Sequence, residues 1–178
     1  GNRHDYSIRP PNPTVLEKLV DAGGTVIGIG KIGDIFAHTG MSEEVRASGH
    51  SELWTETHAA LERAPARSVV MTNFVDFDTL YGHRRDPIGY GKALEEFDRQ
   101  IPELLKSMQA HDLLILTADH GNDPTWHGVD HTREHVPILL YQQNMTACDL
   151  GFRDTFADIA QTLSHIFNLS PFEHGKSF

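Results

Sequence analysis

Three short motifs between residues 78 and 135 contain the residue types that hold divalent metals. They read Asp-Thr-Leu-Tyr-Gly-His over 78–83, Thr-Ala-Asp-His-Gly over 117–121 and His-Thr-Arg-Glu-His over 131–135. Carboxylate oxygens and imidazole nitrogens are common ligands of divalent ions. Two such ions side by side can stabilise both the attacking and the leaving oxygen of a displacement at phosphorus. The motifs therefore predict a two-metal site for phosphoryl transfer.

The spacing within the motifs limits which side chains can meet. Asp78 and His83 stand on a predicted loop or short turn, which allows both to bind one ion but does not require it. Asp119 and His120 are neighbours, and neighbours point to opposite faces of an extended strand. Both can reach one site only if the strand ends there in a turn, which Gly121 allows.

Three further histidines, His127, His131 and His135, follow at intervals of four residues. On a helix this spacing would place them on one face. The adjacent Gly128 and Pro137 favour a loop instead. We therefore expect at most one or two of the three to be ligands, with the others supporting the site or lying on the surface.

Each motif also has a simpler interpretation. An Asp-His pair that follows a strand can serve the turn alone, because Asp accepts backbone hydrogen bonds there. Three motifs that converge on one edge of a sheet favour the metal site over this alternative.

The predicted elements alternate between helices and strands, which is typical of an α/β fold. We expect a mostly parallel sheet with helices on both faces. The predicted strands are 25–29, 68–74, 112–117 and 136–141. The predicted helices are 14–22, 51–63 with Ser51 as its cap, 88–110 with a kink or break at Pro102, and 154–167. Asp78 and Asp119 then lie at the carboxyl ends of two strands, where ligands usually bind in such sheets.

Composition narrows the function classes. With 178 residues and 39% hydrophobic content, the chain is expected to form a single α/β domain over 1–178. A net charge of -10 and the lack of a basic run argue against nucleic acid as a partner, and no apolar run is long enough to span a membrane. The single cysteine, Cys148, excludes an intrachain disulfide and favours a reducing, cytoplasmic compartment.

At its motifs the sequence resembles the phosphopentomutases of the alkaline phosphatase superfamily. The Thr-Ala-Asp-His-Gly motif indicates the superfamily. Gly-His-Arg-Arg-Asp over 82–86, together with Asp-His-Thr-Arg-Glu-His over 130–135, narrows the resemblance to the mutase. It covers nearly the whole chain, with further matching segments at 2–6, 30–35, 73–78, 117–124 and 155–159.

The resemblance implies exchange of phosphate between the 1 and 5 positions of ribose or 2-deoxyribose, through a phosphothreonine and two manganese ions. It implies that one metal is held by Asp78, His83 and His131, and the other by Asp119 and His120. It also suggests that Lys31 contacts the substrate phosphate, with a solvated surface lysine as the alternative. For Arg84, Arg85 and Arg133, ion pairs are the favoured interpretation over support of the site.

Two residues of the family pattern have no counterpart here: an aspartate near the amino terminus and the phosphorylated threonine. We therefore expect the carboxyl-terminal portion of the core, with 1–11 as the return segment from a cap and 12–178 as core, inactive alone. The Asp78 site should retain metal better than the Asp119 site, and exposed apolar sheet edges should promote self-association. The alternatives are a non-catalytic metal-binding domain, a cofactor-independent phosphoglycerate mutase or a phosphatase.

Overall fold

The computed structural model describes residues 7–178, so the predicted return segment 1–11 lies partly outside the described residues. The packing of the backbone divides the chain into two compact units, each described here by itself. The first unit comprises Gly1–Ser48, Thr55–Asn73 and Cys148–Phe178, and the second comprises Gly49–Trp54 and Phe74–Ala147. One helix, α3 (His50–Arg63), contributes residues to both units.

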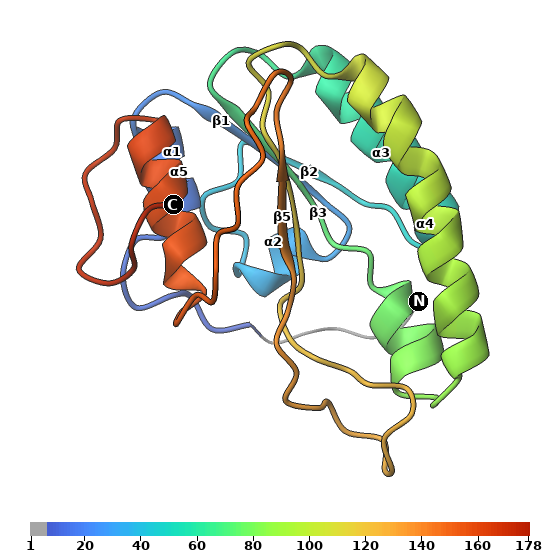
Figure 1. Ribbon diagram of the computed structural model, residues 1–178. Helices are drawn as coiled ribbons and strands as arrows, with labels where there is room; N and C mark the ends of the chain where they lie inside the picture. The colour runs from blue at the N-terminus through green and yellow to red at the C-terminus, as the bar shows by residue number, and fades with distance from the viewer. Residues whose placement is uncertain (1–6) are drawn as a thin grey trace. The chain divides into compact units, whose positions relative to one another are not determined.

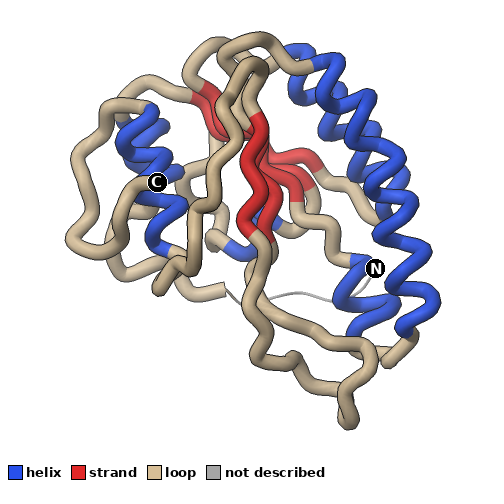
Figure 2. Tube along the Cα trace, viewed as in Figure 1, coloured by secondary structure: helices blue, strands red, loops and turns tan. Residues whose placement is uncertain are grey.

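A three-stranded parallel sheet forms the centre of the first unit. Its strands are β1 (Thr25–Ile29), β2 (Glu43–Val45) and β3 (Ser68–Thr72), in the order β2-β1-β3. In the register, Ile27 pairs with Glu43 on one side and with Val70 on the other. The strands appear in red in Figure 2. This arrangement confirms the predicted α/β class with a parallel sheet.

Two helices of the first unit, α1 (Val15–Asp21) and α5 (Ala157–Ile166), contact each other and lie side by side in Figure 1. A capping box starts α1 as predicted: the Glu17 backbone N–H donates to Thr14 Oγ1, and the Thr14 N–H donates to Glu17 Oε2. The short helix α2 (Ile32–Ile35) follows β1. Buried side chains of α1 and β1, namely Leu16, Leu19 and Val26, form the core of this layer.

The second unit holds the π-helix η1 (Phe77–Gly82), the helix α4 (Pro87–Ser107) and the strands β4 (Leu114–Thr117) and β5 (Ile138–Tyr141). The Asp86 side chain caps α4 by accepting from the Gly89 N–H at 2.8 Å, and Pro87 occupies the first turn. Aromatic rings pack α4 against the start of α3 and against η1. They belong to Trp54, Phe74, Phe77, Tyr90 and Phe97.

Strands β4 and β5 form a separate two-stranded antiparallel sheet, with Leu114 paired to Tyr141 and Thr117 to Ile138. The expectation that β4 and β5 belong to the mostly parallel sheet was therefore wrong. The reason is the connection. Residues 118–137 contain no helix, so the chain returns without the crossover that a parallel partner needs, and β5 reverses direction.

Several boundaries also differ from the predictions. Helix α4 runs without interruption through Pro102, because buried Ala93 and Leu104 hold it on both sides of the proline. Helix α3 begins one residue before Ser51, at His50, whose backbone N–H donates to Asp76 Oδ2 at 3.2 Å. The short elements β2, α2 and η1 were not predicted. Within residues 7–178, no helix combines the length and apolar character needed to cross a membrane.

Candidate metal centre

A π-helical turn brings Asp78 and His83 together. The His83 N–H donates to the Asp78 carbonyl oxygen at 2.9 Å, a bond between residues five positions apart. In an α-helix, side chains five positions apart would point about 140° away from each other. The wider π turn lets both side chains face the same side, and such turns are frequent at functional sites. The sequence predicts a loop or short turn here, and the structure shows a π turn instead.

The loop between β4 and β5 supplies His131. Its base is closed by a bridge in which the Thr132 N–H donates to the Gly121 carbonyl oxygen at 3.1 Å. A Cβ atom at Gly121 would lie 2.7 Å from the carbonyl oxygen of Thr132 and 2.7 Å from the backbone nitrogen of Glu134. A glycine is therefore needed for the loop to close this tightly, and the closure carries His131 back toward η1.

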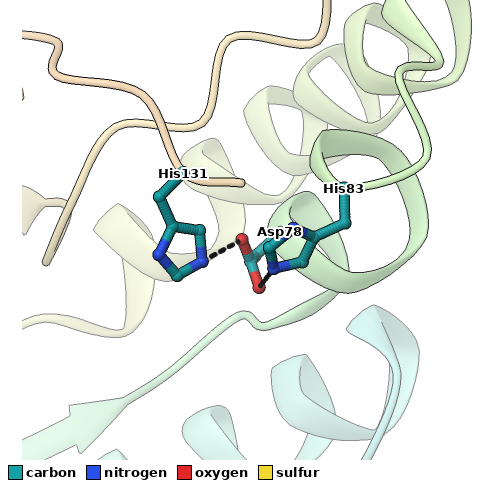
Figure 3. Close-up of side chains that lie close together, drawn as sticks. All are labelled: Asp78, His83 and His131. Carbon is teal, nitrogen blue, oxygen red and sulfur yellow. Dashed lines mark ion pairs between the residues drawn. The ribbon is translucent and has the colours of Figure 1, made fainter. Parts of the chain in front are cut away.

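The three side chains of Asp78, His83 and His131 form a compact cluster (Figure 3). Each offers one ligand atom, and these atoms all lie within 4.8 Å of one another. Asp78 Oδ2 is 3.3 Å from His83 Nε2, and Asp78 Oδ1 is 3.2 Å from His131 Nε2. The two imidazole rings stack with their centroids 4.7 Å apart. The cluster remains open to solvent, since 47% of the His131 side chain is exposed.

The protonation of His83 is constrained by its other ring nitrogen. His83 Nδ1 lies 2.5 Å from the carbonyl oxygen of Val129, which can only accept, so Nδ1 carries a proton. In the neutral ring, Nε2 then presents a lone pair to the Asp78 carboxylate, which is also an acceptor. A divalent ion beside these two acceptors would satisfy both, as would a second proton on Nε2. Imidazoles that ligate metals typically have their second nitrogen fixed in this way.

The side chain of Asn122 supports Asp78 and was not predicted from the sequence. Its Nδ2 donates to Asp78 Oδ1. The Asn122 side chain lies so close to the backbone of residue 82 that a glycine is required there, because a Cβ atom would lie 2.4 Å from Asn122 Nδ2. The signal available in the sequence was the position of Asn122, directly after the Asp-His-Gly motif, but a single amide gives no pattern that distinguishes it from a loop residue.

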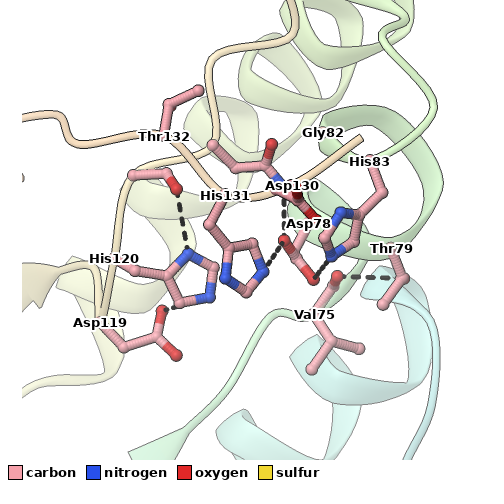
Figure 4. Close-up of polar contacts among 12 residues, drawn as sticks. Val75, Asp78, Thr79, Gly82, His83, Asp119, His120, Asp130, His131 and Thr132 are labelled. Atoms are coloured by element: carbon pink, nitrogen blue, oxygen red, sulfur yellow. Dashed lines mark hydrogen bonds and ion pairs between the residues drawn. The ribbon is translucent and has the colours of Figure 1, made fainter. Parts of the chain in front are cut away.

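Asp119 and His120 lie beside the cluster but are not among its three members (Figure 4). The ring of His120 stacks on that of His131 with centroids 3.8 Å apart. His120 Nε2 is 3.7 Å from Asp119 Oδ1, and His120 Nδ1 is 3.2 Å from the Gly121 carbonyl oxygen. The end of β4 at Thr117 provides the turn that lets both side chains lie near one another. With 64% of its side chain exposed, Asp119 is open to a further ligand.

The other residues singled out in the sequence take different places. His127 is exposed on the loop, with its ring 4.7 Å from that of Trp126, and His135 is exposed later in the same loop. Lys31 lies in the first unit, directly before α2 at the carboxyl end of β1. Arg84 donates to the Thr79 carbonyl oxygen at 3.4 Å. The described hydrogen bonds of Arg85 all go to carbonyl oxygens, four of the backbone and one of the Asn122 side chain.

The negative charge of Asp78 influences its surroundings. The pKa of the Tyr90 phenol is raised, first by burial and then by the charge of Asp78. Both effects disfavour the tyrosinate.

Comparison with known proteins identifies the family. The model of the metalloenzyme superfamily matches residues 1–171. The chain belongs to the metalloenzyme superfamily. For a member of this superfamily, a cluster of one carboxylate and two imidazoles is a suitable ligand set for a divalent ion, and these donors fit such an ion in number and type.

Relatives with high identity carry the name phosphopentomutase. The chain is 59% identical to that of Chromohalobacter salexigens, 56% to that of Shewanella frigidimarina and 55% to that of Erwinia tasmaniensis. In each comparison all of this chain is matched, against 44% of the relative. The chain thus spans less than half the length of the curated relatives it matches.

Proposed function

We propose that this chain provides metal-binding residues of a phosphopentomutase, which interconverts ribose or deoxyribose 1-phosphate and 5-phosphate. The main observation in support is the convergence of Asp78, His83 and His131, whose ligand atoms lie within 4.8 Å of one another. The name of the relatives, at 53–59% identity over almost the whole chain, supports the choice of reaction. The substrate would be a pentose phosphate.

In this proposal Asp78, His83 and His131 hold one divalent ion, and Asp119 with His120 contributes to a second. Manganese is the expected metal. When bound, the ions would supply positive charge to the oxygens of the phosphoryl group during its transfer. The chain's own residues prepare the site: Val129 fixes the ring nitrogen of His83, and Asn122 orients the Asp78 carboxylate. Lys31 is proposed to contact the substrate phosphate, because a lysine can neutralise phosphate charge.

We further propose that the 178-residue chain does not isomerise pentose phosphates by itself. The proposal rests on the family resemblance, which implies a threonine nucleophile without a counterpart in this sequence, and on the match to only 44% of the length of the relatives. The proposed compartment is the cytoplasm, because the one cysteine, Cys148, is exposed and forms no intrachain disulfide.

The test uses two preparations: the 178-residue chain and the longest open reading frame that encodes it. Each is incubated with Mn²⁺ and ribose 5-phosphate, and ribose 1-phosphate is measured. The proposal expects product only with the longer protein, and none after His131→Ala. Isomerisation by the 178-residue chain alone would show that it needs no further residues. Activity of the longer protein on phosphoglycerate and not on pentose phosphates would place it with another enzyme of this superfamily.

A further inference from the structure

The guanidinium group of Arg85 lies inside the loop that carries His131. Its Nε donates to the Gly128 carbonyl oxygen at 2.6 Å, and its Nη2 donates to that of Asp130. Its Nη1 faces three oxygens: the Asp123 carbonyl at 2.8 Å, the Asn122 side-chain Oδ1 at 2.7 Å and the Gly82 carbonyl at 3.1 Å. The Arg85 side chain thus binds five acceptors, one in η1 and four in the loop 122–130.

All five acceptors are neutral carbonyl oxygens, whereas arginine side chains often pair with carboxylates. Had the guanidinium paired with Asp78, its positive charge would compete with a cation for that carboxylate. Instead, Arg85 binds the Oδ1 atom of Asn122, and the Nδ2 atom of the same amide donates to Asp78. Because an amide has one oxygen and one nitrogen end, the bond to Arg85 also fixes which end faces Asp78. Asp78 is oriented while its negative charge remains available.

The contacts of Arg85 also hold the backbone that positions His83 and His131. The carbonyl group of Val129, which receives the proton of His83 Nδ1, lies between the Gly128 and Asp130 carbonyls that Arg85 binds. His131 directly follows Asp130. The backbone of Arg85 itself has a φ of 54°, a left-handed conformation that costs energy for a residue with a side chain. This conformation is consistent with a position that is held by the contacts of its side chain.

We propose that Arg85 is a positioning residue of the metal centre: its guanidinium presets Asp78, His83 and His131 by holding Asn122 and the carbonyls of residues 123–130. The inference rests on the proposed metal binding at these three residues. It assigns to Arg85 no contact with the ion or with substrate. The predicted consequence is a loss of metal affinity that exceeds any loss of overall stability.

The experiment measures the Mn²⁺ dissociation constant of the 178-residue chain by isothermal titration calorimetry, for the unmodified chain, Arg85→Ala, Arg85→Lys and Arg84→Ala. Changing residues that orient metal ligands typically weakens metal affinity about 10- to 100-fold. We expect a loss in that range for Arg85→Ala and an intermediate loss for Arg85→Lys, whose ammonium lacks the planar fork. Arg84→Ala is the matched control, since Arg84 is exposed and has one long bond to Thr79. The Mn²⁺ dissociation constant of Arg84→Ala should stay within about twofold of that of the unmodified chain.

Two further measurements separate positioning from general stability. Denaturant unfolding in the presence of EDTA should give similar unfolding midpoints for all four proteins. Hydrogen exchange of the backbone amides of residues 123–130 should be faster in Arg85→Ala than in the unmodified chain. Millimolar guanidinium should partly restore Mn²⁺ affinity to Arg85→Ala and leave the unmodified chain unchanged. If Arg85→Ala fails to fold, Arg85→Lys decides by the same readouts.

The outcomes distinguish the inference from the proposed function. An unmodified chain that does not bind Mn²⁺ would overturn the metal site and the role of Arg85 with it. Tight binding by the unmodified chain with equal affinity in Arg85→Ala, or in Arg85→Lys where Arg85→Ala does not fold, would overturn the role of Arg85 alone. A loss that follows the unfolding midpoint, without guanidinium rescue, would also overturn it, because Arg85 would then serve only the fold.

Discussion

His83 Nδ1 lies 2.5 Å from the carbonyl oxygen of Val129, while His83 Nε2 faces the Asp78 carboxylate at 3.3 Å. The contact of Nδ1 with Val129 determines which hydrogen-bonding role Nε2 can take toward Asp78. With its proton held at Nδ1, a neutral His83 presents the Nε2 lone pair toward Asp78, which is the arrangement that a shared metal ion needs. The loop of residues 121–132 therefore prepares His83 as a ligand as well as supplying His131.

Replacing His131 should abolish tight metal binding. His131→Ala removes one of three ligand atoms, and we expect the Mn²⁺ dissociation constant of the chain to rise by more than about 100-fold, beyond the range of about 10- to 100-fold typical of residues that orient ligands. His127→Ala is the control, because His127 is exposed on the same loop and outside the cluster. Calorimetric titration of both variants measures the difference. Equal affinities would remove His131 from the site.

A methyl group at position 82 should disturb the contact between Asn122 and Asp78. In Gly82→Ala the new Cβ would lie 2.4 Å from Asn122 Nδ2, so Asn122 must move away from Asp78. We expect a destabilisation of about 1–3 kcal/mol, as for other overpacked positions, together with weaker Mn²⁺ binding. Urea unfolding and calorimetry measure the two effects.

Gly91→Ala is the matched control for this variant. Gly91 lies within α4, and a Cβ atom there would meet no atom within 4 Å. The replacement should stabilise the chain by about 0.5–1 kcal/mol, since alanine favours the helix, and should leave metal binding unchanged. A Gly82→Ala variant that behaves like Gly91→Ala would show that the contact between Asn122 and Asp78 is dispensable.

His50 should make the chain less stable in mild acid. Burial lowers the pKa of His50, and the opposing charges of Asp76 and Glu96 only partly offset this. The unfolded chain therefore binds a proton here at a higher pH than the folded chain. Stability is lost as the pH falls below the ordinary histidine pKa of about 6.5. In His50→Gln, unfolding free energies measured in urea between pH 7 and 5 should fall less steeply than in the unmodified chain, whereas His127→Gln should follow it.

Asp158 should contribute stability that disappears in stronger acid. Its pKa is lowered, first by the backbone N–H of Lys176 and then by Arg153, whose Nε lies 2.8 Å from Asp158 Oδ2. The contribution is complete above the ordinary aspartate pKa of about 3.9 and is lost as the pH falls through the lower value in the folded chain. Asp158→Asn should therefore be less stable at pH 7, and the difference should narrow below about pH 4. Denaturant titrations at both pH values test this, with exposed Glu173→Gln as control. A difference that persists undiminished in acid would contradict the assignment.

Local sequence patterns predicted those elements whose stability is local. The Thr14–Glu17 capping box placed the start of α1, and the apolar run of β1 placed a buried strand at Thr25–Ile29. Pairing between strands depends on distant contacts. For that reason the antiparallel partnership of β4 with β5, and the three-residue strand β2, could not be read from their own residues.

The candidate site was predictable in its ligands and not in its support. Asp78, His83 and His131 stand in motifs whose residue types suggest metal binding, and the structure brings their side chains together. The π turn that aligns the first two, the Asn122 amide and the carbonyl contacts of Arg85 depend on backbone geometry in a loop without periodicity. An arginine among charged residues suggests ion pairs, and only the folded loop shows that carbonyl groups surround it.

The most direct test of the metal centre is anomalous scattering from crystals of the chain grown with Mn²⁺. We expect a peak within coordination distance of Asp78, His83 and His131, about 2.0–2.2 Å from their ligand atoms by analogy with other divalent ions. Occupancy should be lower beside Asp119 and His120, where the chain supplies two side chains instead of three. A full peak found only beside Asp119, with none between Asp78 and the two histidines, would contradict the proposed metal centre.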